Sequence, residues 1–140
     1  MKIKIYSLVV SLVFIPVAVL GQFLGSYLGY FLYFIYDKIM FLNLPVFIYE
    51  TAPLVISGVV AGGASAFSVS KIYKSYDLIF VTIIPLIIVL IAFLGDLSLL
   101  AKEGLGLKSI SPILRELATI SIYYYLLKAK YFLKQWIINI

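Results

Sequence analysis

The chain contains 140 residues, of which 64% are hydrophobic and 12% are charged, whereas soluble domains average about 45–50% and about 25%. Too few charged residues are present to cover the surface of a soluble domain of this size, so the composition predicts a protein embedded in lipid. The absence of cysteine and histidine excludes disulfides and removes the commonest metal ligands and bases, and the net charge of +5 is too dispersed to indicate nucleic-acid binding.

The first apolar segment runs without a charge from residue 5 to residue 36, which is farther than a bilayer requires. A helix of that length would reach roughly 48 Å, whereas the hydrocarbon core is about 30 Å thick. We expect a span over residues 8–34, with a kink at Pro16 and a tyrosine-rich end that rises through the headgroup layer. Cleavage of a signal peptide after Gly21 would leave a segment too short to span comfortably, so we expect a retained signal anchor.

Two further apolar segments predict spans over residues 52–70 and 77–95. Pro53 lies near the start of the first, where proline is tolerated, and Pro85 lies inside the second, where neighbouring helices must support a kink. The connector at residues 39–49 is too apolar for an ordinary loop. We expect it to lie in the outer interface and to cover the bundle.

A fourth span is predicted over residues 112–133, although its uncharged centre is short. Residues 117–127 supply only about 16 Å of helix, so Arg115 and the flanking lysines must extend toward the interfaces. Ser111 followed by Pro112 is typical of a helix start, and Trp136 suits the far interface. The alternative is a helix that lies along the membrane surface.

The distribution of basic residues predicts the topology, because cytoplasmic loops carry an excess of lysine and arginine. With four spans, the larger set falls on one side: Lys2, Lys4, Lys71, Lys74, Lys128, Lys130 and Lys134. The smaller set falls on the other side: Lys38, Lys102, Lys108 and Arg115. We therefore predict one all-α domain over residues 1–140, a four-helix bundle in the plasma (inner) membrane with both termini cytoplasmic.

Small residues recur at every fourth position in the first two spans and predict close helix–helix packing. The predicted packing face consists of Gly21, Gly25, Gly29, Gly58, Gly62 and Ala66. In lipid, close approach of two backbones supplies van der Waals contact and weak hydrogen bonds that apolar side chains alone do not provide. We favour packing of the first span on the second within one chain. A seam between two copies and a pore-lining groove are the alternatives.

Polar residues within the predicted spans are few. The candidates for intramembrane contacts are Gln22, Ser57, Ser65, Arg115 and Glu116. We expect Gln22 to make an interhelical hydrogen bond. Arg115 and Glu116 fall in the first turn of the predicted fourth helix, where we expect them to face water. If they are buried, they require partners such as Asp96 or Glu50.

No set of acids, bases, nucleophiles or metal ligands converges in the sequence, so we expect no enzyme and no catalytic, metal or cofactor-binding residues. The favoured hypothesis is an accessory or interaction subunit that acts through helix packing. Its partners would be the lipid bilayer and either a second copy or another membrane protein, with no nucleic acid. The alternative is an oligomeric small-solute transporter or channel protomer, although the sequence shows no clear charge at mid-depth and no paired broken helices.

Overall fold

The computed structural model describes residues 2–39, 45–72, 77–104 and 106–138, and all of their regular structure is helical. The helices are α1 (Lys2–Ser11), α2 (Phe14–Ile39), α3 (Val46–Ile72), α4 (Leu78–Glu103) and α5 (Leu107–Ile138). The all-α prediction is confirmed. Lys74 and residues 40–44 of the predicted interfacial connector lie outside the described residues, as do the side chains of Lys134 and Trp136.

Three helical segments are long and apolar enough to cross a membrane by length and composition: Lys2–Lys38, Phe47–Ile72 and Leu78–Lys102. They correspond to the first three predicted spans and are consistent with an integral membrane protein. α5 is longer than a span requires but does not belong to this set among the described helices.

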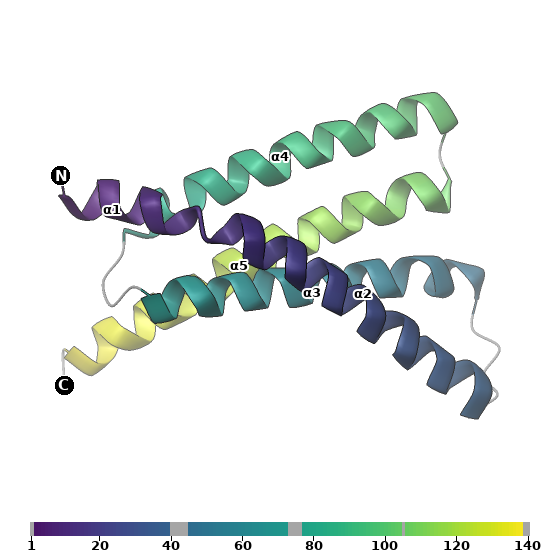
Figure 1. The fold of residues 1–140 in the computed structure, drawn as a ribbon, viewed down its shortest axis with the longest axis horizontal. Helices are drawn as coiled ribbons and strands as arrows, with labels where there is room; N and C mark the ends of the chain where they lie inside the picture. Colours follow the sequence, from purple (N-terminus) through teal and green to yellow (C-terminus); the bar gives the residue numbers. More distant parts are fainter. Residues whose placement is uncertain (1, 40–44, 73–76, 105, 139–140) are drawn as a thin grey trace.

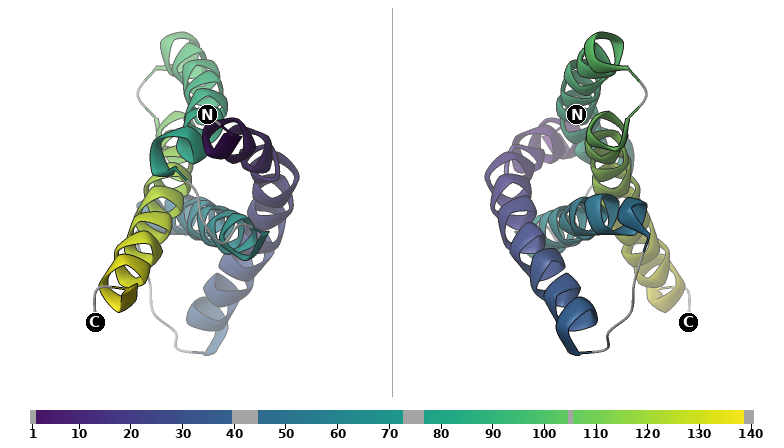
Figure 2. Two further views of the ribbon diagram at one scale, coloured as in Figure 1. Left: turned by 90° about the vertical axis from the view of Figure 1, so that its left-hand side faces the viewer. Right: turned by 90° about the vertical axis from the view of Figure 1, so that its right-hand side faces the viewer.

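α1 and α2 run in the same direction, and from α2 to α5 each helix runs opposite to the one before it, with α3 and α5 side by side at the centre of the bundle (Figure 1). α2 packs along α3, and α4 packs along α5 and against α1. Figure 2 shows α3 between α2 and α5. Both termini lie at the same end of the bundle, beside the end of α3 and the start of α4.

A break at Leu12 and Val13 separates α1 from α2, one turn before Pro16. Proline has no N–H, and its ring crowds the carbonyl four residues earlier, which belongs to Leu12. In the structure this carbonyl accepts instead from the N–H of Ile15, at 3.2 Å. The kink predicted at Pro16 therefore takes the form of a break one turn upstream.

The start of α4 is tied to α1 through Asp77. Its carboxylate caps α4 by accepting from the N–H groups of Ile79 at 3.1 Å and Phe80 at 3.4 Å. The N–H of Asp77 donates to Ser7 Oγ at 3.1 Å, and the Lys4 ammonium lies 5.2 Å from the Phe80 ring centroid. These contacts hold the first helix against the bundle.

Tyr123 of α5 lies in the core and is fully buried. Its hydroxyl donates to Val81 O of α4 at 3.0 Å, and its ring meets Phe14 edge-on at a centroid distance of 5.0 Å. Val81 O requires an external donor because the residue four positions later is Pro85, which has no N–H. Tyr123 therefore satisfies the carbonyl that the proline leaves without a helical partner.

Replacing Tyr123 with phenylalanine is expected to lower the free energy of unfolding by about 0.6–1.7 kcal/mol, as observed for single hydrogen bonds between membrane helices. The loss should largely disappear in a Pro85→Ala background, because the alanine N–H can satisfy Val81 O. Reversible unfolding of the four proteins in mixed detergent micelles measures both effects. Equal losses in the two backgrounds would contradict the role assigned to the hydroxyl.

The glycines of α2 pack directly on the backbone of α3. Added Cβ atoms would lie 2.7 Å from Ala61 Cα at Gly21, 2.6 Å from Ser57 Cα at Gly25 and 2.6 Å from Pro53 Cα at Gly29. These separations are too short for any side chain, so the two helices touch through their backbones. The four-residue spacing keeps the contact on one face of each helix.

Gly58 and Gly62 face α5 instead of α2. Added Cβ atoms would lie 2.3 Å from Arg115 O and 2.3 Å from Thr119 O, respectively. The α2 glycines therefore meet Pro53, Ser57 and Ala61 of α3, whereas Gly58 and Gly62 serve the contact with α5. α3 lies between α2 and α5 and presents a different small-residue face to each of them.

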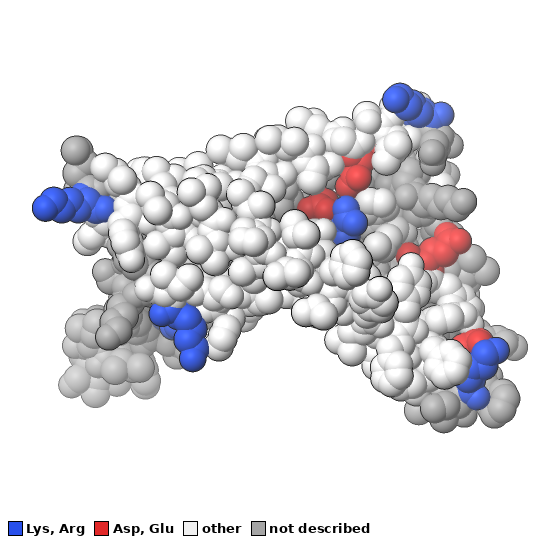
Figure 3. Space-filling model, viewed as in Figure 1, with Lys and Arg blue, Asp and Glu red and all other residues white. Residues whose placement is uncertain are grey.

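Charged residues are divided unequally between the two ends of the bundle. The end with both termini carries Lys2, Lys4, Lys71, Lys128 and Lys130, together with Asp77. The other half carries Asp37, Lys38, Glu50, Asp96, Lys102, Arg115 and Glu116. On the face shown in Figure 3, lysine atoms stand alone at the left, and acidic atoms occur only toward the right.

Candidate functional site

Arg115 and Glu116 lie well inside α5, because the helix begins at Leu107 and not at the predicted start near Pro112. Pro112 lies inside α5, beyond the first turn of the helix, and therefore does not mark its start. The expected water-facing position is wrong for Glu116, of which only 4% is exposed. The side chain of Arg115 is 27% exposed and therefore only partly covered.

The two side chains form an ion pair through one carboxylate oxygen. Glu116 Oε1 lies 2.8 Å from a terminal guanidinium nitrogen of Arg115 and accepts from the Arg115 Nε–H at 2.9 Å. The amide nitrogen of Gln22 lies 3.5 Å from the same oxygen, at the outer limit of hydrogen-bond distance. Among the described residues, neither Asp96 nor Glu50 forms an ion pair with Arg115.

The backbone around the pair is held by close contact with α3. Arg115 O lies against Gly58, where a Cβ atom would clash, and also accepts from the Thr119 hydroxyl at 2.9 Å. A glycine Cα hydrogen can approach such a carbonyl closely and form a weak hydrogen bond. Gly58 therefore helps to set the depth at which Glu116 enters the bundle.

Arg115 and Glu116 lie at the level of the midpoint of α3, because Arg115 contacts Gly58. Gly58 lies near the midpoint of α3, about 18 Å from its start and about 21 Å from its end at 1.5 Å per residue. If α3 crosses the bilayer, the adjacent Arg115 and Glu116 lie far from both headgroup layers. Ionisable residues at such depth are costly and are functional-site candidates.

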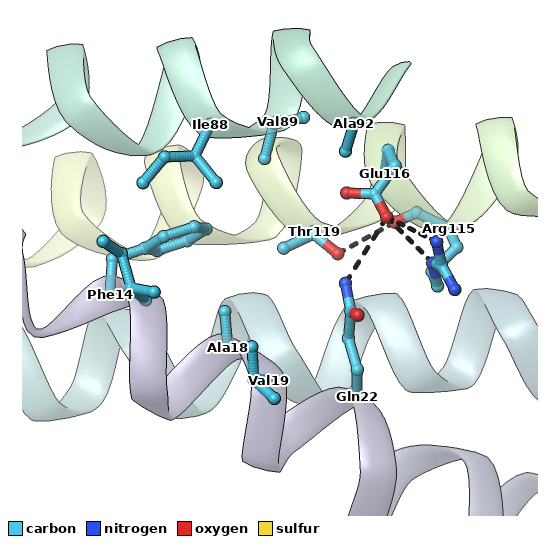
Figure 4. Close-up of a pocket in the computed structure, with 11 residues that line it drawn as sticks. Phe14, Ala18, Val19, Gln22, Ile88, Val89, Ala92, Arg115, Glu116 and Thr119 are labelled. Carbon is cyan, nitrogen blue, oxygen red and sulfur yellow. Dashed lines mark hydrogen bonds and ion pairs between the residues drawn. The ribbon is translucent and has the colours of Figure 1, made fainter. Parts of the chain in front are cut away.

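Glu116 lines a cavity of about 230 Å³ between α2, α4 and α5 (Figure 4). α2 contributes Phe14, Ile15, Ala18 and Val19 to its walls, together with the polar Gln22. α4 contributes Ile88, Val89 and Ala92. Ile15 and Val19 are 43% and 60% exposed, so the cavity is open on the side where they lie.

The second carboxylate oxygen of Glu116, Oε2, has no hydrogen-bond or ion-pair partner in the described part of the chain. Figure 4 shows it turned away from Arg115 and Gln22, toward the space between α4 and α5. A carboxylate oxygen accepts hydrogen bonds strongly, and Oε2 is not one of the fully buried, unpartnered atoms of the described chain, so it is accessible from the cavity. The cavity thus has apolar walls and one free anionic acceptor.

Similarity to other proteins does not identify this site. The chain matches no known protein family, curated protein or solved structure. No group of three or more acidic residues suited to a metal ion occurs within the described ranges. The site is therefore interpreted from its own geometry.

The remaining predicted polar residues lie outside the cavity. Ser57 and Ser65 of α3 are fully buried, and their hydroxyls have no hydrogen-bond partner within the described structure. Ser57 faces Gly25 and belongs to the contact between α2 and α3. Asp96 also has a buried, unpartnered oxygen, but it does not line the cavity.

Sequence reasoning missed the apolar walls of the cavity and Thr119, which also lines it. These residues belong to three helices and follow no motif. One signal was present in the sequence: Ala18 and Ala92 are small residues within runs of large aliphatic ones. Small side chains at these positions leave space where larger ones would fill the gap between α2 and α4.

Proposed function

We propose that the chain is a four-span protein of the plasma (inner) membrane with both termini cytoplasmic. The position of α5 supports the fourth span, because the helix runs beside α3 at the centre of the bundle and buries Tyr123 and Leu127 completely. An even number of spans also suits termini at one end, and the lysines at that end suit the cytoplasmic side.

Single cysteines test this topology cleanly, because the chain has no cysteine of its own. We expect a membrane-impermeant thiol reagent to label Lys71→Cys and Lys130→Cys from the same side of the membrane, and Lys102→Cys from the other side. Lys71→Cys lies at the end of α3, and its side of the membrane is the same whether or not α5 spans. This variant therefore serves as the reference. Labelling of Lys102→Cys and Lys130→Cys from the same side would contradict the fourth span.

We further propose that the protein is a small-solute transporter protomer without enzymatic activity, and that its solute binds in the cavity beside Glu116. The observation that carries this proposal is the ion pair of partly exposed Arg115 with buried Glu116, which lies beside the midpoint of α3 and borders a partly open cavity. Ionisable residues that face a cavity within a membrane bundle typically mark substrate pathways. The sequence alone shows no clear charge at mid-depth, which weakens the transporter hypothesis. The position of Arg115 and Glu116 beside α3 supports it.

Reaction of a cysteine placed in the cavity tests the transport proposal. In liposomes, Ala92→Cys is expected to react with a water-soluble, membrane-impermeant reagent, because a transport site must connect with water in some state of its cycle. Leu90→Cys, on an outward-facing position of the same helix, should react only with a lipid-soluble reagent. If Ala92→Cys also reacts only with the lipid-soluble reagent, the transport proposal is refuted.

An accessory or interaction subunit is the second candidate. The small-residue faces that favoured it are occupied within the chain, by α2 against α3 and by α3 against α5. The feature that now supports it is the outward face of α4, which exposes Leu86, Ile87, Leu90, Ile91 and Leu94. Stoichiometric co-purification with another membrane protein in mild detergent would favour this candidate over a transporter that purifies alone.

A further inference from the structure

We infer that the cavity beside Glu116 binds the hydroxyl-bearing end of a neutral, membrane-soluble alcohol, which donates a hydrogen bond to Glu116 Oε2. The inference rests on the proposed function and deepens it by naming the class of solute. Three properties of the cavity carry it: its free acceptor, its charge balance, and its shape and position.

The free acceptor requires a donor from the ligand. All the recorded partners of the Glu116 carboxylate, the two Arg115 nitrogens and the Gln22 amide, lie at Oε1. The residue is only 4% exposed, but Oε2 is not one of the fully buried, unpartnered atoms of the described chain, so a ligand in the cavity can reach it. A hydroxyl group supplies one strong, directional donor to an ionised oxygen.

The charge balance of the cavity favours a neutral ligand. Arg115 compensates Glu116, and among the described residues no other ionisable side chain lines the cavity. An ammonium ligand would bring a positive charge that nothing in the lining balances, and a carboxylate ligand would place a second negative charge beside Glu116. Either would leave an uncompensated charge in a region of low dielectric constant, which is costly.

The shape and position of the cavity favour a molecule that enters from lipid. Its volume of about 230 Å³ is below the roughly 300–1,000 Å³ of pockets that enclose a whole drug-sized ligand. The apolar side chains of Ile15 and Val19 lie at its open side. The cavity therefore suits the polar end of a longer molecule, with the apolar tail extending out past α2 into the bilayer.

Photolabelling of the full chain in nanodiscs tests this inference. The probe is decanol with a diazirine in its chain, and the competitors are decanol, decyl methyl ether, decylamine and decanoate, each corrected for partition into the lipid. We expect decanol to compete at least about tenfold better than the methyl ether, which lacks the donor. It should also compete better than either charged analogue. Equal competition by alcohol and ether, or stronger competition by the amine or the acid, would overturn the inference.

A matched pair of variants locates the site. Ala92→Leu is expected to fill the cavity and to abolish the labelling that decanol displaces, whereas Ala101→Leu, at an exposed position of the same helix, should retain it. If Ala92→Leu does not fold, the position of the label in the wild-type chain decides. Labels on residues 14–22, 88–92 and 115–119 support the site, and labels confined to residues outside these three segments refute it.

The two proposals can fail separately. Displaceable labelling by the alcohol without reaction of Ala92→Cys with a water-soluble reagent would refute transport and leave the alcohol site intact. Reaction of Ala92→Cys without preference for the alcohol would refute the solute class and leave transport intact.

Discussion

Replacing Gly62 with alanine is expected to lower the free energy of unfolding by about 1–3 kcal/mol, the usual cost of inserting a methyl group into a packed interior. The added Cβ would lie 2.3 Å from Thr119 O and 3.1 Å from Tyr123 N. Both atoms belong to the backbone of α5, so no side-chain rotation can relieve the overlap. α3 and α5 must separate, and the packing at the centre of the bundle is lost.

Gly63 supplies the matched control, because it is the next residue on the same helix. A Cβ at Gly63 would have Leu126 Cδ1, at 3.9 Å, as its nearest neighbour, which is an ordinary contact with a flexible side chain. Gly63→Ala should therefore leave stability unchanged or raise it slightly, since alanine favours helix over glycine. Reversible unfolding in mixed micelles compares the two variants. Similar losses for both would contradict the close contact between α3 and α5.

Replacing Arg115 with methionine is expected to cost about 3–5 kcal/mol at neutral pH, as for other buried ion pairs from which one partner is removed. The loss arises because the buried Glu116 carboxylate then has no compensating cation. Partial exposure of Arg115, at 27%, points to the lower part of that range. Unfolding in mixed micelles measures the loss directly.

The double variant Arg115→Met, Glu116→Met separates the cost of an unpaired charge from the cost of lost packing. Two apolar side chains of similar length should recover most of the stability, because they require no compensation. Lys38→Met is the surface control, since its contact with Asp37, at 3.3 Å, is largely exposed and exposed pairs contribute only about 0–1 kcal/mol. A loss of stability in Arg115→Met no larger than that in Lys38→Met would show that the ion pair of Arg115 with Glu116 is not buried.

The double variant also addresses function. It retains a folded bundle but removes the acceptor, so it should lose the decanol-sensitive labelling proposed for the cavity. A folded double variant that binds the alcohol as well as the wild-type chain would show that Glu116 is not the acceptor.

Much of the fold was predictable because helix formation in an apolar chain is decided locally. Uncharged runs such as residues 5–36 and 78–95 must satisfy their backbone hydrogen bonds within the segment, and a helix does so. The break before Pro16 is also local, since it follows from the missing N–H and the crowded carbonyl of Leu12. α5 begins upstream of the predicted start near Pro112, because the helix accommodates this proline in its interior.

The candidate site was only partly predictable. Arg115, Glu116 and Gln22 were identified as polar residues near apolar segments, but Glu116 was expected to face water. Its burial depends on the depth at which α5 meets α3, and that depth follows from the contact of Gly58 with Arg115 O. No local pattern around Glu116 contains this information.

By itself, the sequence determined an all-helical, apolar chain, the approximate extents of its first three spans, and the small-residue faces through which helices approach. These features depend on hydropathy, side-chain size and backbone hydrogen bonding within single segments. Only the tertiary structure decided that α3 presents one small face to α2 and another to α5, and that Glu116 turns a free oxygen into a cavity. Those features depend on the rotation and depth of one helix against another, which contacts between residues far apart in the chain determine.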